Sequence, residues 1–187
     1  MTNRTPADLA SLIKSAFPLH PVPTHVVDNQ EMHQKAALSS EYGQILSIFL
    51  GKSWAEITYQ QVWDGYSGGT PGVAFYLLSC EALRYYLPAW MMMCIEDVSP
   101  EGSDALDPLL GLLKRGGEWA IGSVEDFDKT FGALTISQKA AVAAFLKYAD
   151  FAFPSVYPSG FASMAYTSYW HQFDTDKSPL VQDKPSP

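Results

Sequence analysis

The stretch that decides the fold runs from Ser79 to Asp97 and reads SCEALRYYLPAWMMMCIED. At helical spacing its apolar residues fill one face with Leu83, Leu87, Trp90 and Cys94 and an adjoining face with Tyr86, Ala89 and Met93. Ser79 is a favourable N-cap, and Pro88 is expected to kink the helix because it removes one backbone hydrogen bond. A helix that is apolar on nearly all sides lies at the centre of a fold. The sequence therefore predicts a central helix over residues 80–97.

Helix signals flank this central segment on both sides. N-cap residues precede apolar stretches of helical period at several places. They predict a first helix that begins at Pro6 and stops before Pro18, and further helices over residues 29–50, 104–114, 124–131, 136–150 and 161–173, with two short turns that begin at Ser53 and Thr58. Residues 64–72, DGYSGGTPG, are expected to form a loop, because four glycines and a proline disfavour a regular element. Residues 73–78 are a candidate for a short strand.

These patterns predict a mainly α protein. We expect a single-domain bundle of about six to eight helices around the central helix, with little or no β structure. The helical domain is expected to cover residues 1–173. A polar tail follows at residues 174–187, where ten of the fourteen residues are Asp, Lys, Ser or Pro.

The composition indicates an ordinary globular domain. Of the 187 residues, 47% are hydrophobic and 17% charged, which is too apolar for a disordered chain. The net charge of −8 argues against nucleic-acid binding, because phosphate contacts need a basic surface. Charges and a proline interrupt the most apolar stretch, residues 74–95, so no membrane span is expected. The N-terminus has no secretory pattern and the chain has two cysteines, so we expect a cytoplasmic protein.

The motifs that come nearest to catalytic or metal-binding patterns are incomplete. Gly51-Lys52-Ser53 resembles the end of a phosphate-binding loop, but Leu46 stands where that motif requires a glycine. The densest set of potential metal ligands matches no known spacing and consists of His25, Asp28, Glu31 and His33. We therefore expect no enzymatic activity, no metal and no cofactor.

Charged residues on the central helix open two alternatives. Glu81 and Arg84 are three residues apart and can pair on one side of the helix. Such charges are costly in an apolar setting unless they are paired. The first interpretation is architectural, with Arg84 bound to a carboxylate and packed against aromatic rings. The alternative is a small-ligand or enzymatic site formed by Glu81, Arg84, Tyr85 and Tyr86.

The segment between residues 96 and 128 carries nearly the whole net charge. Nine acids less two bases, Lys114 and Arg115, give −7. One interpretation is a solvated surface with acids at helix N-termini. The other is an acidic surface for a basic protein partner, with Trp119 on an exposed loop as its apolar anchor. The residues predicted to bind the partner are Glu96, Asp97, Glu101, Asp104, Asp107, Glu118, Trp119, Glu125 and Asp126.

Several phrases resemble a family of small uncharacterised bacterial proteins, a domain of unknown function. Residues 78–90 are close to its L-[ST]-P-E-A-[FL]-R-Y-Y-L-P-A-aromatic phrase, although Cys80 replaces the proline. Residues 49–54, FLGKSW, and the phrases LTISQ and AFLKY near residues 134–148 are similar as well. The resemblance covers about residues 5–172 and implies no catalytic residues. Its context implies an immunity protein that neutralises a cognate bacterial toxin.

Overall fold

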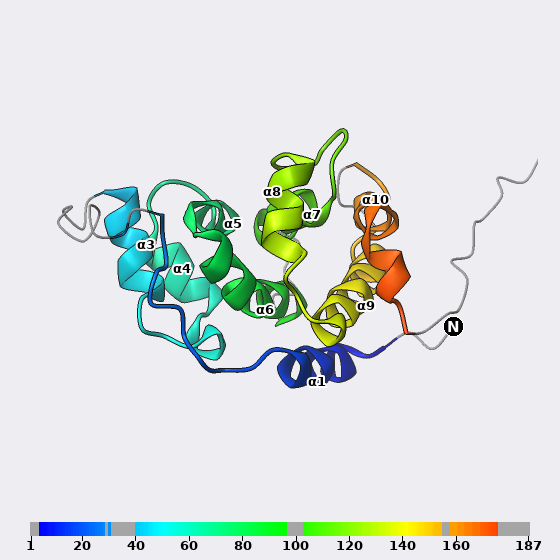
Figure 1. Cartoon of the computed structure of the whole chain (residues 1–187), viewed down its shortest axis with the longest axis horizontal. Helices are drawn as coiled ribbons and strands as arrows, with labels where there is room; N and C mark the ends of the chain where they lie inside the picture. Colours follow the sequence, from blue (N-terminus) through cyan, green and yellow to red (C-terminus); the bar gives the residue numbers. More distant parts are fainter. Residues whose placement is uncertain (1–3, 29, 31–39, 97–102, 155–157, 176–187) are drawn as a thin grey trace, which may run out of the picture.

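The computed structural model describes residues 4–28, 30, 40–96, 103–154 and 158–175. These residues form α-helices and short 3-10 helices, with no β-strand among them (Figure 1). The α-helices are α1 (Pro6–Ala16), α3 (Glu41–Phe49), α4 (Tyr59–Gly65), α5 (Pro71–Ala74), α6 (Cys80–Glu96), α7 (Ser103–Leu113), α8 (Val124–Phe131), α9 (Ile136–Ala152) and α10 (Phe161–Ser168). The 3-10 helices are η1 (Trp54–Glu56), η2 (Phe75–Leu77) and η3 (Trp170–Phe173). The prediction of a mainly α fold is confirmed.

Helix α6 lies at the centre, as its apolar surface predicted. Nearly all its side chains from Ala82 to Ile95 are buried. The buried polar atoms of its aromatic residues find backbone partners. Trp90 Nε1 donates to the carbonyl of Ala105 at 2.7 Å, and the Tyr86 hydroxyl bonds the carbonyl of Phe49 at 2.6 Å. These bonds offset the cost of burying an indole N–H and a phenol.

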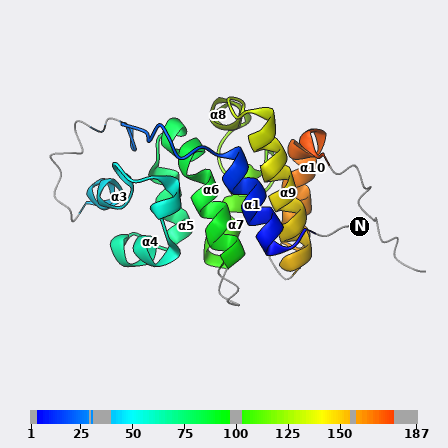
Figure 2. The same cartoon turned by 90° about the horizontal axis from the view of Figure 1, so that it is seen from below.

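The other helices surround α6 in two groups. Figure 1 shows α3, α4 and α5 on one side and α8, α9 and α10 on the other. Helix α7 contacts α5, α6 and α10, while α1 contacts both α6 and α9 (Figure 2). The beginning of the chain therefore packs beside a helix from its last third. None of the described helices has the length and apolar character needed to cross a membrane.

Local side-chain signals set the helix starts. Thr5, Thr58, Ser123 and Thr135 each close a capping box with the residue three positions later. Each box satisfies backbone N–H groups that the first helical turn leaves without partners. The predicted starts of the helices that follow these four residues are confirmed.

The glycine-rich segment differs from its prediction. Gly65 ends α4, and Pro71 to Ala74 form α5, followed directly by η2 where a short strand was a candidate. A Cβ on Gly72 would lie 2.6 Å from the carbonyl oxygen of Asp104. The glycine therefore permits α5 to pack closely on α7, and this tertiary contact outweighs the low helix propensity of the segment.

Two predicted boundaries, those of the helix over residues 29–50 and of the C-terminal tail, can be compared with the described residues. The helix predicted over residues 29–50 is seen as α3 at its C-terminal end, while residues 31–39 lie outside the described residues. Residues 176–187 of the predicted tail also lie outside them. Asp174 accepts hydrogen bonds from Lys147 Nζ and the Tyr166 hydroxyl, both at 2.8 Å. The packed part of the chain thus reaches Asp174.

Candidate functional site

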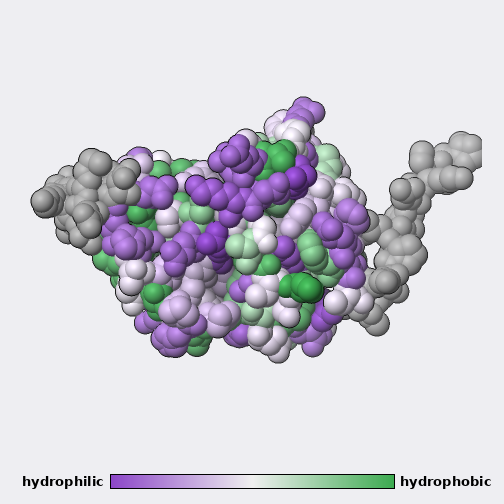
Figure 3. Space-filling view, viewed as in Figure 1, coloured by the Kyte–Doolittle hydropathy of each residue, from purple (hydrophilic) through white to green (hydrophobic). Residues whose placement is uncertain are grey.

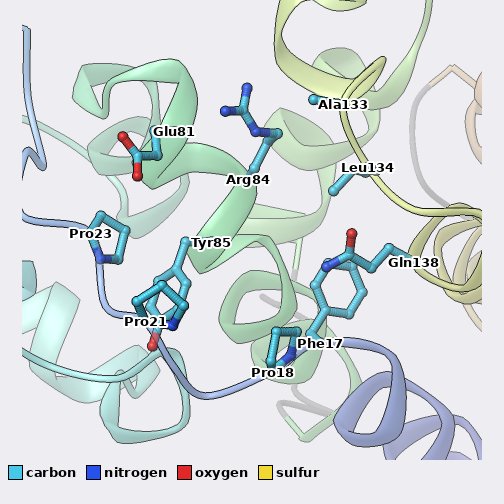
Figure 4. Close-up of a pocket in the computed structure, with 10 residues that line it drawn as sticks. All are labelled: Phe17, Pro18, Pro21, Pro23, Glu81, Arg84, Tyr85, Ala133, Leu134 and Gln138. Atoms are coloured by element: carbon cyan, nitrogen blue, oxygen red, sulfur yellow. The ribbon is translucent and has the colours of Figure 1, made fainter.

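Helix α6 brings three of the four residues of the predicted alternative site to one cavity of about 180 Å³ (Figure 4). We call it the Arg84 pocket. Its walls come from the segment after α1, from the first half of α6 and from the start of α9. The lining residues are Phe17, Pro18, Pro21, Pro23, Glu81, Arg84, Tyr85, Ala133, Leu134 and Gln138. Tyr86 is not among them, because its ring is buried in the core.

Arg84 binds a helix end and not a carboxylate, so the predicted partner is wrong. Its Nη1 donates to the carbonyl oxygens of Lys129 and Thr130 at 3.2 and 3.3 Å. These carbonyls belong to the last turn of α8, where backbone acceptors lack helical partners and the helix dipole is negative. A guanidinium is a suitable cap at that position.

The predicted pair between Glu81 and Arg84 does not form. Glu81 is exposed, and it makes no hydrogen bond or ion pair with another described residue. Both side chains leave α6 at the rim of the pocket, as Figure 4 shows. The helix therefore presents a carboxylate and a guanidinium three residues apart without joining them.

Tyr85 and Tyr86 have structural roles. The Tyr85 hydroxyl donates to the carbonyl of Leu19, which fixes the proline-rich segment against α6. The Tyr86 hydroxyl bonds the carbonyls of Phe49 and Lys52 on the other side of α6. Burial raises the pKa of both phenols above the ordinary value of a tyrosine.

Gln138 contributes a polar group to the opposite wall. Its Oε1 accepts the backbone N–H of Thr135 at 2.9 Å as part of the capping box of α9. This bond leaves the Nε2 donor of Gln138 without a partner among the described residues. The sequence identified the capping box, but its position opposite Arg84 depends on long-range packing.

The second candidate site lies between α7 and α8. We call residues 114–123 the Trp119 loop. It is held at its base, where the Arg115 guanidinium donates to both carboxylate oxygens of Asp128 at 2.8 and 2.6 Å. The backbone N–H of Ile121 also donates to the carbonyl of Gly111 at 2.8 Å. The loop therefore has a defined conformation against α7.

Trp119 lies at the surface of this loop in an unusual backbone conformation. Its side chain is 45% exposed, and its φ of 67° falls in the left-handed region that large side chains avoid. Gly116, Gly117 and Gly122 have positive φ as well. Ile121 and Val124 are 39% and 42% exposed nearby in the sequence. Strain of this kind is a common feature of functional loops.

The predicted acidic residues divide between the two ends of α7. Asp104 and Asp107 are half-buried in its first half, next to α5 and η2. Glu118, Glu125 and Asp126 are exposed around the Trp119 loop and the start of α8. In Figure 3 hydrophilic side chains gather over this loop and α8. Glu96 is exposed at the end of α6, while Asp97 and Glu101 lie outside the described residues.

Some of these acids already have structural partners. Asp126 closes the capping box with Ser123, whose hydrogen bonds hold its pKa below the usual range. Asp107 has a buried Oδ1 without a hydrogen-bond partner among the described residues. Burial, and to a lesser degree the charge of Asp104, raises the pKa of Asp107. Glu118 and Glu125, by contrast, are exposed and make no hydrogen bond or ion pair with another described residue.

The described residues hold no group of three or more His, Cys, Asp or Glu side chains suited to a metal ion. Of the four potential ligands in the sequence, His25 and Asp28 are described and exposed. Glu31 and His33 lie outside the described residues.

The fold and its two candidate sites define a helical domain with a small pocket and an exposed aromatic loop. Residues 5–174 match the model of a family of unknown function, DUF6714, and the chain belongs to that family. Membership agrees with the resemblance to an uncharacterised family. No curated protein and no solved structure matches the chain.

Proposed function

We propose that the chain is a non-enzymatic protein-binding protein and that the Trp119 loop is its contact surface. The observation that carries the proposal is the exposed Trp119, held in a left-handed conformation on a loop whose base is fixed. Tryptophan is prominent among the residues that contribute most to protein interfaces. A loop that is already ordered loses little conformational entropy when it binds.

Charge indicates the kind of partner. Glu118 and Glu125 are exposed, as are Trp119, Ile121 and Val124, and all five residues fall within positions 118–125. An apolar centre with a charged rim is the usual arrangement of a protein interface. Complementary charge speeds association and selects against acidic partners. We therefore propose a basic protein as the partner.

We further propose that the partner is a cognate bacterial toxin and that the chain is its immunity protein. A small acidic chain without a complete catalytic motif suits that role, because it neutralises a cationic toxin by covering its surface. The proposed site of action is the cytoplasm.

The test compares proteins retained from lysate by the purified chain and two variants. Trp119→Ala should lose a basic protein that the wild type retains at low salt. Trp63→Ala is the matched control, because Trp63 is 51% exposed on α4, away from the loop. The retained protein should also be toxic when expressed alone, and co-expression of the wild-type chain should relieve the toxicity. A retained set that is identical for all three proteins would rule out the Trp119 loop as the contact surface.

A further inference from the structure

The Arg84 pocket carries a second inference, which is independent of the proposed protein partner. We propose that it binds a small zwitterion with an apolar body, of the chemical class of a free aliphatic α-amino acid. Three features support this ligand: the small size of the cavity, the polar groups left without partners at its rim and the apolar side chains in its lining.

Size limits the ligand. The cavity has a volume of about 180 Å³. Cavities that hold drug-sized molecules begin at about 300 Å³. The cavity is therefore of the size that suits a free amino acid.

Two side chains can donate hydrogen bonds to a carboxylate. The bonds to α8 use Nη1 of Arg84, so Nε and Nη2 have no partner among the described residues. Gln138 offers its Nε2 from the start of α9, on the side of the pocket opposite α6 (Figure 4). A guanidinium binds a planar carboxylate through parallel hydrogen bonds, and the amide adds a third donor.

One acceptor can bind an ammonium group. Glu81 has a carboxylate that no described residue pairs, and it lies one helical turn before Arg84. Side chains three residues apart on a helix have Cβ atoms about 5–6 Å apart. The carboxylate and ammonium of an α-amino acid share one carbon, so the proposed ligand has its carboxylate on Arg84 and its ammonium on Glu81.

The rest of the lining suits an aliphatic side chain. Phe17, Pro18 and Leu134 supply apolar surface, and the Tyr85 hydroxyl is already bonded to Leu19. The proline segment is thus fixed before any ligand arrives, which lowers the entropy cost of binding.

The experiment titrates L-leucine into the full chain and follows heat or backbone amide shifts. Saturable binding with shifts at Glu81, Arg84 and Gln138 is expected. N-acetyl-L-leucine lacks the ammonium group and L-leucine methyl ester lacks the carboxylate, so each should bind about tenfold more weakly or worse. Equal binding of all three compounds would contradict recognition of a zwitterion. Absence of saturable leucine binding at concentrations up to about 10 mM would overturn the site.

The variants separate binding from folding. Gln138→Glu retains a side chain that closes the capping box with Thr135 and places a negative charge where the carboxylate should bind. It should abolish leucine binding and leave the melting temperature nearly unchanged. Gln61→Glu is the matched control, because Gln61 has the same capping position in α4. Wild-type binding by Gln138→Glu would contradict the proposal, and Trp119→Ala should bind leucine normally whether or not the proposed protein partner exists.

Discussion

Arg115 and Asp128 are joined by two hydrogen bonds that connect the start of the Trp119 loop to the middle of α8. The pair closes the base of the Trp119 loop, and the backbone N–H of Arg115 also donates to Ser168 Oγ at 3.0 Å. The two side chains are 36% and 46% exposed, so solvent weakens their contribution to global stability. Their main effect is therefore local: they hold the two ends of the loop together.

The first prediction concerns this local effect. Asp128→Asn should weaken the pair and open the loop more often, so the amide of Ile121, bonded to Gly111, should exchange with solvent faster. The melting temperature should change little, since exposed pairs contribute about 1 kcal/mol or less. Glu125→Gln, a charge removal on the same helix outside the pair, is the control. Unchanged exchange at Ile121 in Asp128→Asn would show that the pair does not hold the loop.

The second prediction concerns the cap on α8. Arg84→Ala removes the guanidinium from the carbonyls of Lys129 and Thr130 and should destabilise the protein by about 1 kcal/mol or somewhat more. Arg84→Lys retains the charge at the helix end and should recover part of the loss. Urea unfolding at neutral pH measures both variants. If Arg84→Ala unfolds at the wild-type midpoint, the contacts to α8 contribute nothing to stability.

The third prediction concerns pH. The pKa of Asp107 is raised in the folded state, so its ionised form opposes folding at neutral pH. That penalty should fall as the pH decreases through the folded-state pKa toward the ordinary value of an aspartate. Asp107→Asn removes the charge and should be more stable than the wild type at pH 7, with a difference that shrinks at acid pH.

Urea unfolding of both proteins between pH 7 and pH 4 measures this difference. Glu118→Gln is the control, because Glu118 is exposed on the Trp119 loop. A wild type that stays more stable than Asp107→Asn across the whole range would contradict the raised pKa. It would then follow that Asp107 has a stabilising partner when ionised.

The helix starts were predictable because their signals are local. A capping box such as that of Thr135 and Gln138 lies within four residues, and its hydrogen bonds form wherever the helix is placed. The central position of α6 was also predictable, because a helix that is apolar on all sides is buried when other helices surround it.

The contacts that build the candidate sites were not predictable, because they join residues distant in sequence. The hydroxyl of Tyr85 reaches Leu19 across 66 positions, and Arg84 reaches Thr130 across 46. Arg84 could be identified as a charge that needs a partner, but backbone carbonyls of α8 carry no signature in the sequence. The sequence predicts a loop at Gly72 for a similar reason. The helical conformation there depends on close packing against α7, which is a long-range contact.

The last prediction tests the backbone of the Trp119 loop without any partner. At a φ of 67° a residue with a Cβ is strained, whereas glycine adopts this conformation readily. Trp119→Ala and Trp119→Gly remove the same indole contacts, so their difference reports the backbone alone. Trp119→Gly should therefore be the more stable of the two by up to about 1 kcal/mol.

At Trp63 we expect the opposite order of stability between the glycine and alanine variants. It is exposed within α4, where glycine has lower helix propensity than alanine, so Trp63→Gly should be less stable than Trp63→Ala by about 1 kcal/mol. Thermal or urea unfolding of the four variants yields both differences. If alanine is favoured at both positions, Trp119 has an ordinary backbone conformation in solution. A preference for glycine at Trp119 alone would mean that the chain retains a tryptophan at a stability cost, which is expected when a residue is retained for binding.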